Sequence, residues 1–170
     1  RPQSGRLRQF NQFGVEFFGN RNILSDLEVI LLADNFLNKI GIREKLRLEI
    51  NSLGNKESRK EYLKSLKEFF NKKKSHLSEE SLGRLEKNPL RILDSKNSED
   101  LEIVKECPKI YSFFDRESSD FLDGITKGLN QLEIKFELNS SLVRGLDYYN
   151  HTAFEYKTFE EKSQNTILAG

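Results

Sequence analysis

The most informative stretch of this sequence is Ser141-Leu142-Val143-Arg144-Gly145-Leu146-Asp147-Tyr148-Tyr149-Asn150-His151-Thr152. It places an arginine and two adjacent tyrosines just ahead of a strand-like run that reaches Phe159. Arginine supplies a rigid donor fork for a carboxylate or a phosphate, and tyrosine supplies an apolar ring with a polar tip. The stretch therefore predicts a site for a small polar ligand. A turn followed by buried tyrosines is the alternative that these residues allow when they are taken alone.

A second stretch, from Gln9 to Phe18, alternates in a way that predicts a strand. Its buried face would consist of Phe13, Val15 and Phe17, and its other face of Phe10, Gln12, Gly14 and Glu16. A ring, an amide and a carboxylate are unusual on a plain sheet surface, so this second face is a candidate for binding. A solvated strand face is the alternative.

The remaining pattern predicts a mixed α+β chain. Ser25-Asp26-Leu27-Glu28 has the form of a capping box that opens a helix, and Gly41 is suited to end it. A strand over 46–50 follows, and strand alternation returns at 134–138. Between them the spacing of apolar residues predicts four helices. We therefore expect a small helical domain, 55–132, inserted into a domain made of 1–54 and 133–170.

Composition narrows the classes of function. The chain has 170 residues and a formal net charge of +1, which argues against a general nucleic-acid coat but allows a local basic face such as Lys72-Lys73-Lys74. A solvated helix end is the alternative for these lysines. The single Cys107 excludes an internal disulfide and a Cys-cluster metal site, which fits a reducing, cytoplasmic compartment. No apolar run is long enough for a membrane span, and the absence of Met indicates a piece of a longer protein.

Three strings carry a resemblance to one family. Residues 1–16 resemble the second half of motif 2 of class II aminoacyl-tRNA synthetases in its histidyl version. Residues 88–96 are similar to a string in the insertion domain of bacterial histidyl enzymes, and residues 142–150 resemble the histidine signature. The chain is identified as a member of the histidyl-tRNA synthetase family. The resemblance implies part of a class II antiparallel sheet with flanking helices, plus a helical insertion domain.

The resemblance also implies a reaction and the residues that serve it. Histidine would be activated with ATP to histidyl-adenylate and then transferred to tRNA(His), with Mg²⁺ expected to accompany ATP and no protein-bound metal. Arg144 would be catalytic and would also contact histidine. The other residues implied to bind histidine are Gln12, Glu16, Tyr148 and Tyr149, and those implied to bind ATP are Arg6 and Phe10. The full-length protein would be a cytoplasmic homodimer.

The family pattern extends beyond this sequence, because the first arginine and glutamate of motif 2, motif 1, motif 3 and the anticodon-binding domain are absent from it. We therefore expect the 170-residue chain to be inactive by itself. One alternative is a synthetase-like regulatory subunit of histidine biosynthesis without ligase activity. Such proteins typically lack both the helical insertion and the intact signature string. The other alternative is an RNA-binding insertion module, which an excess of basic residues on one helix face would favour.

Overall fold

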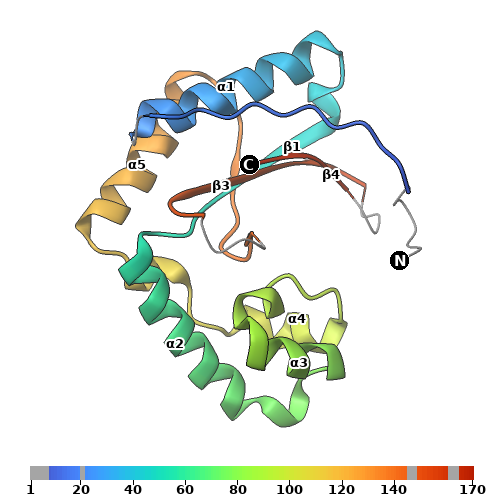
Figure 1. The fold of residues 1–170 in the computed structure, drawn as a ribbon, viewed down its shortest axis with the longest axis vertical. Coiled ribbons are helices and arrows are strands. Elements are labelled where there is room, and N and C mark those ends of the chain that lie inside the picture. Colours follow the sequence, from blue (N-terminus) through green and yellow to red (C-terminus); the bar gives the residue numbers. More distant parts are fainter. Residues whose placement is uncertain (1–7, 20–21, 145–148, 161–164) are drawn as a thin grey trace. The chain divides into compact units, whose positions relative to one another are not determined.

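The computed structural model describes residues 8–19, 22–144, 149–160 and 165–170 (Figure 1). These residues form an α+β fold, as the sequence predicts. The helices are α1 (Ile23–Lys39), α2 (Lys56–Lys72), α3 (Glu79–Lys87), α4 (Ser98–Lys105) and α5 (Arg116–Gln131). The strands are β1 (Leu46–Ser52), β2 (Glu137–Leu138), β3 (Thr152–Thr158) and β4 (Thr166–Ala169), in the sheet order β2-β1-β3-β4. Short 3₁₀ turns are η1 (Arg43–Lys45), η2 (Lys74–His76), η3 (Pro89–Ile92) and η4 (Ile110–Phe113).

The chain divides into two compact units. Unit 1 comprises residues 1–49, 123–137 and 154–170, and unit 2 comprises residues 50–122 and 138–153. These boundaries describe how contacts group along the chain and differ from the expected domain limits at 54/55 and 132/133. The assignment of 55–132 as an inserted domain stays a prediction.

Unit 1 is built on the apolar face of α1. Leu27, Ile30 and Leu37 recur at helical spacing and are buried, with Ile30 fully enclosed. The helix begins one turn earlier than the predicted capping box, because the Asn22 side chain accepts a hydrogen bond from the Ser25 amide at 2.9 Å. Asn is as good an N-cap as Ser, and Ser25, the first residue of the predicted capping box, is not the cap. Gly41 has a φ of 75°, which confirms the predicted left-handed residue after the helix.

The later part of α5, from residue 123 on, belongs to unit 1 and packs closely on α1 because it carries glycines. A Cβ added at Gly124 would lie 2.4 Å from Ile23 Cδ1, and one added at Gly128 would lie 2.3 Å from Leu27 Cδ1. The two glycines are four residues apart and therefore lie on one face of α5. Any larger side chain there would have to displace an apolar side chain of α1.

The predicted strand from Gln9 to Phe18 is wrong. Residues 8–19 lie outside helices and strands, and the expected buried face is exposed: Phe13 by 74% and both Val15 and Phe17 by 47%. A strand is stable only when its backbone groups pair with a neighbour, and no strand of the described residues pairs with this stretch. The predicted strand at 134–138 is likewise reduced to β2, at 137–138.

Unit 2 contains a helical core. Its buried side chains come from α2, α3, η3, α4 and η4 and from residues that flank them: Tyr62, Leu66, Phe70, Leu77, Leu85, Leu90, Ile92, Leu93, Ile103, Val104, Cys107 and Ile110. The fully buried carboxylate of Asp100 lies at the start of two helices in this unit. It accepts the Ser78 amide at 2.9 Å and the hydroxyls of Ser81 and Ser95, each at 2.6 Å. It therefore joins α4 to the N-terminus of α3.

Candidate functional site

Two of the predicted site residues meet in unit 2. The Arg144 guanidinium lies over the ring of Tyr149, with its central carbon 5.7 Å from the ring centroid. Both side chains are half-buried. Stacking of this kind holds a guanidinium in place against an aromatic ring. Residues 145–148, including the predicted site residue Tyr148, lie outside the described residues. The segment 142–151, called the signature segment below, is thus described as two arms, 142–144 and 149–151.

The first arm is fixed by the side chain of Asn51, at the end of β1. The Asn51 Nδ2 donates to the carbonyl oxygen of Leu142 at 2.8 Å, and its Oδ1 accepts from the Tyr111 hydroxyl at 2.8 Å. Asn51 and Leu142 are both buried, at 1% and 5% exposure. Asn51 therefore uses both ends of its amide in the interior of unit 2. The carbonyl that it binds lies two residues before Arg144.

The second arm is fixed by Arg59 and by backbone bonds. The Arg59 Nη1 donates to the carbonyl oxygen of Tyr149 at 3.0 Å. Farther along, the His151 amide donates to the Gly54 carbonyl at 2.9 Å, and the His151 carbonyl accepts from the Leu53 amide at 2.6 Å. The His151 ring stacks on Phe121 at a centroid distance of 4.4 Å and an interplanar angle of 19°. Both arms therefore depend on residues 51–59.

The tight turn at Gly54 allows this approach. Its φ is 63°, a region that residues with a side chain rarely adopt, and an added Cβ would lie 3.0 Å from Phe114 Cε1. His151 itself has a φ of 50°. The paired backbones at 53–54 and 151 thus pass through two left-handed residues, one of them a glycine.

The other predicted site residues lie in unit 1, in the stretch 8–19. Phe10 is 69% exposed, and Gln12 and Glu16 are exposed as well. Gly14 has open space where a Cβ would stand. The prediction grouped Phe10, Gln12 and Glu16 because they would share one face of a strand. The structure has no strand at these residues. Arg6 lies outside the described residues.

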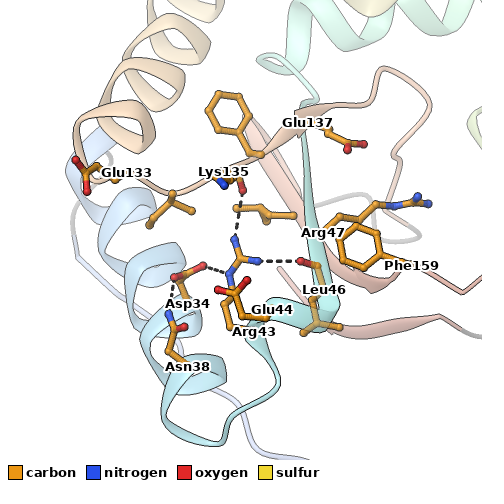
Figure 2. A pocket seen from close by; sticks show the side chains of 13 residues that line it. Asp34, Asn38, Arg43, Glu44, Leu46, Arg47, Glu133, Lys135, Glu137 and Phe159 are labelled. Atoms are coloured by element: carbon orange, nitrogen blue, oxygen red, sulfur yellow. Dashed lines mark hydrogen bonds and ion pairs between the residues drawn. The ribbon is translucent and has the colours of Figure 1, made fainter.

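A separate hollow of about 450 Å³ in unit 1 contains no predicted site residue (Figure 2). Arg43 lies at its centre (Figure 2), and each of its three guanidinium nitrogens already has a partner. The Nε is paired with Asp34, Nη1 donates to the Leu46 carbonyl at 2.9 Å, and Nη2 donates to the Lys135 carbonyl at 3.3 Å. Tyr156 also donates to Asp34 at 3.1 Å. Arg43 thus ties η1 to α1 and to the backbone near β2, which is a structural role.

Charged side chains on β1 and β3 in unit 1 also pair with one another. Lys157 donates to Glu49 at 2.8 Å and lies 3.0 Å from Glu155, and Arg47 pairs with Glu49 at 3.0 Å. Burial alone would lower the pKa of Lys157, but the hydrogen bonds to Glu49 and Glu155 outweigh it and raise that pKa. The amine is therefore held charged and is a poor candidate for acid–base chemistry.

The basic run at the end of α2 is only partly available to a phosphate. Lys73 is paired with Glu106 at 3.1 Å, with both side chains exposed. Lys72 lies in the last turn of α2, where a positive charge also suits the helix dipole, and Lys74 begins η2. The structure therefore gives Lys72 and Lys73 ordinary roles at a helix end, and a contact with tRNA stays a prediction.

The described residues, 8–19, 22–144, 149–160 and 165–170, include neither a metal-binding cluster nor a membrane-spanning helix. In these ranges no group of three or more His, Cys, Asp or Glu side chains is arranged to hold a metal ion. No helix within the same ranges combines the length and the apolar character of a membrane span.

A family model described as Histidyl-tRNA synthetase matches residues 1–170. The chain belongs to this family. Among curated relatives, the histidine–tRNA ligase of Wolbachia pipientis wMel is 47% identical over the whole chain, which covers 42% of that protein. The histidine–tRNA ligase of Streptococcus mutans is also 47% identical, with 39% of its length covered. The chain therefore spans about two-fifths of the length of these relatives.

A solved structure of a histidyl-tRNA synthetase has a similar fold. The crystal structure of the apo S. aureus enzyme matches with a TM-score of 0.66 and 30% sequence identity. The match covers 89% of this chain and 36% of that one. The α+β fold of the family is therefore present in the described residues.

Sequence reasoning missed the residues that hold the signature segment. Asn51 directly follows the predicted strand over 46–50, and nothing in one sequence separates a turn asparagine from a buried one. Arg59 did carry a signal. It lies three residues before Tyr62 and seven before Leu66, in register with the buried stripe of α2. A charged residue on an apolar stripe indicates a specific buried partner.

Proposed function

We propose that the chain is a segment of a histidine–tRNA ligase. In the first step, a carboxylate oxygen of histidine attacks the α-phosphorus of ATP, and histidyl-adenylate and pyrophosphate form. In the second step, a terminal ribose hydroxyl of tRNA(His) attacks the histidyl carbonyl carbon and AMP leaves. The observation that carries this proposal is the match of the family model to all 170 residues. The 47% identity to curated histidine–tRNA ligases supports it.

Arg144 is the proposed catalytic residue. The attacking group belongs to the substrate, so the protein has to align the reactants and stabilise charge as it develops on phosphorus. A guanidinium suits that task because it stays charged and can bind two oxygens at once. Its half-buried position over the Tyr149 ring supports this role, since a partly dry site strengthens electrostatic interactions.

Recognition of histidine is assigned to Gln12, Glu16, Tyr148 and Tyr149, with Arg144 shared between recognition and catalysis. Gln12 would accept from the ammonium group, and Glu16 would accept from an imidazole N–H. The tyrosines would enclose the imidazole ring, whose flat face suits aromatic packing.

ATP is assigned to Arg6 and Phe10. Phe10 would stack on adenine, and Arg6 would approach the phosphates. An exposed aromatic ring at position 10 is consistent with a residue whose partner is a ligand. Mg²⁺ would enter with ATP, whose phosphate oxygens are the hard ligands that this ion prefers.

The proposal extends to domains and partners. Residues 55–132 would form a helical insertion domain, and 1–54 with 133–170 would form part of the catalytic domain. Besides histidine and ATP, the full-length protein would bind tRNA(His), form a homodimer and work in the cytoplasm. The 170-residue chain would be inactive by itself, because the relatives it matches are more than twice as long.

Histidine-dependent ATP–pyrophosphate exchange tests this proposal directly. The full-length protein should exchange pyrophosphate when histidine is present and not when glutamine or phenylalanine replaces it. The 170-residue chain, measured in parallel, should show no exchange. A folded full-length protein that exchanges no pyrophosphate with histidine would contradict the proposed activity.

A further inference from the structure

We propose that Asn51, Arg59 and Tyr111 are positioning residues that set the two arms of the signature segment. Asn51, oriented by Tyr111, sets the arm that carries Arg144, and Arg59 sets the arm that carries Tyr149. None of the three is proposed to touch a substrate. The inference rests on the proposed function, because it assigns the arms to two parts of one reaction.

Each arm has a carbonyl oxygen that accepts from a side chain distant in sequence: Leu142 from Asn51 at 2.8 Å, and Tyr149 from Arg59 at 3.0 Å. A peptide group that is held by such a bond cannot rotate freely, so the residues next to it keep their direction. Arg144 follows Leu142 by two residues, and Tyr149 carries its own bonded carbonyl. The two donors therefore act on the residues that are proposed to do the chemistry.

The orientation of the Asn51 amide decides whether its N–H group faces the first arm. An amide can turn over and exchange its oxygen with its nitrogen, and only one orientation presents N–H to the Leu142 carbonyl. The Tyr111 hydroxyl donates to Asn51 Oδ1 at 2.8 Å, which selects that orientation. Tyr111 is itself held by packing, since its ring lies edge-on to Phe114 at a centroid distance of 5.6 Å. The order of dependence is Tyr111, then Asn51, then the Leu142 arm.

The two arms are expected to affect different kinetic constants. Arg144 is proposed to stabilise the transition state, so a misdirected first arm should lower kcat for adenylate formation. Tyr149 is proposed to enclose the imidazole, so a misdirected second arm should raise KM for histidine. A residue that merely stabilises unit 2 would not divide its effects in this way.

The test measures kcat and histidine KM of pyrophosphate exchange in the full-length protein. Asn51→Asp keeps the shape of the side chain and replaces its donor with a second acceptor, and we expect kcat to fall by about 10- to 100-fold. Tyr111→Phe removes one oxygen and should lower kcat by roughly 3- to 10-fold. Arg59→Gln should raise histidine KM about tenfold with little change in kcat, and Arg59→Lys should recover part of that loss.

Tyr62→Phe is the matched control. Tyr62 lies in the same aromatic core of unit 2, and the described residues provide no hydrogen-bond partner for its buried hydroxyl. Its removal should leave both constants unchanged and should not lower the thermal unfolding midpoint, because an unpaired buried hydroxyl does not stabilise the fold. Each variant is also compared with the unaltered protein by thermal unfolding, and Tyr111→Phe is the mildest change if Asn51→Asp does not fold.

The outcomes separate this inference from the proposed function. No exchange by the unaltered full-length protein counts against the ligase assignment itself. Normal exchange by that protein together with unchanged constants in Tyr111→Phe and Arg59→Gln overturns the positioning roles alone. Changes in kcat or KM that only follow a loss of thermal stability would reduce the three residues to structural ones and would also overturn the proposal. The supporting result is a kcat effect in one arm and a KM effect in the other, with the unfolding midpoint unchanged.

Discussion

The signature segment and the stretch 8–19 both carry proposed site residues, and they differ in how their backbones are held. Within unit 2, the signature segment receives hydrogen bonds from Asn51 and Arg59, which are 91 and 90 residues away from their acceptors. Within unit 1, the stretch 8–19 belongs to no strand, and its described aromatic contact is the stack of Phe13 on Phe36. Alternating polarity alone does not make a strand. A backbone becomes fixed when distant groups satisfy its donors and acceptors.

The largest effect is expected at Arg144, the proposed catalytic residue of the signature segment. Arg144→His in the full-length protein should lower kcat for pyrophosphate exchange by about 10²- to 10³-fold, because one donor to a developing charge is typically worth about 3 to 4 kcal/mol. Histidine KM should change much less, since this interaction is made mostly in the transition state. Arg91→His, at an exposed arginine of η3, is the control and should leave both constants unaltered. Normal exchange by Arg144→His would remove this residue from the mechanism.

A large effect on stability is expected at Asp100. Its buried carboxylate joins α4 to the N-terminus of α3 through hydrogen bonds, as Asn51 and Arg59 hold the signature segment through hydrogen bonds. Asp100→Asn should lower the free energy of opening of α3 and α4 by about 3 kcal/mol, because it weakens buried hydrogen bonds to a charge. Amide hydrogen exchange in α3 and α4 measures this quantity. Asp120→Asn is the control, since the Asp120 side chain is 70% exposed and its ion pair with Arg116 spans 3.6 Å. Equal effects of the two substitutions would show that the Asp100 network contributes little.

The same carboxylate predicts a dependence of stability on pH. Burial by itself would raise the pKa of Asp100, but hydrogen bonds from Ser81, Ser95 and Ser78 outweigh it and hold that pKa below its ordinary value. A carboxylate with a lowered pKa stabilises the folded state above its unfolded pKa of about 3.9. This stabilisation is lost as the pH falls through the lower, folded value. Acid titration of α3 and α4 exchange should therefore show a loss in the unaltered protein that Asp100→Asn lacks.

The sequence predicts much of unit 2 and less of unit 1, for a physical reason. Local chemistry accounts for both ends of α3, because the Ser78 side chain caps its first turn and Pro89 follows shortly after its last residue. The N-cap of α1 was misplaced by one turn because Asn22 and Ser25 are equally good caps and only one of them receives the bond. The prediction that one face of residues 9–18 is buried was wrong. Such burial depends on a neighbouring strand, which the alternation of residues within one stretch does not specify. The contact of Arg144 with Tyr149 was anticipated only as shared membership of one pocket, and its supports at Asn51, Arg59 and Tyr111 required the folded chain.

A smaller effect tests whether the stretch 8–19 takes part in binding despite its exposure. Glu16→Gln in the full-length protein should raise histidine KM by roughly 10- to 100-fold, which corresponds to a lost charge-assisted hydrogen bond of about 1.5 to 3 kcal/mol. The KM for ATP should stay nearly constant. Glu28→Gln, at an exposed position of α1, is the matched control. An unchanged histidine KM would leave the signature segment as the better-supported part of the site.

The smallest effect is expected from Phe13→Ala in the 170-residue chain. Phe13 is 74% exposed, and its ring stacks on Phe36 with centroids 5.6 Å apart and an interplanar angle of 27°. Such a pair at the surface is worth at most about 1 kcal/mol, so amide exchange in α1 should change little. Ile30→Ala, at a fully buried position of the same helix, should cost about 3 kcal/mol and sets the scale. A Phe13 effect as large as that of Ile30 would mean that the stretch 8–19 is packed on α1 in solution. A large effect confined to the full-length protein would mean instead that residues outside this chain cover Phe13 and supply the burial that its alternating pattern predicts.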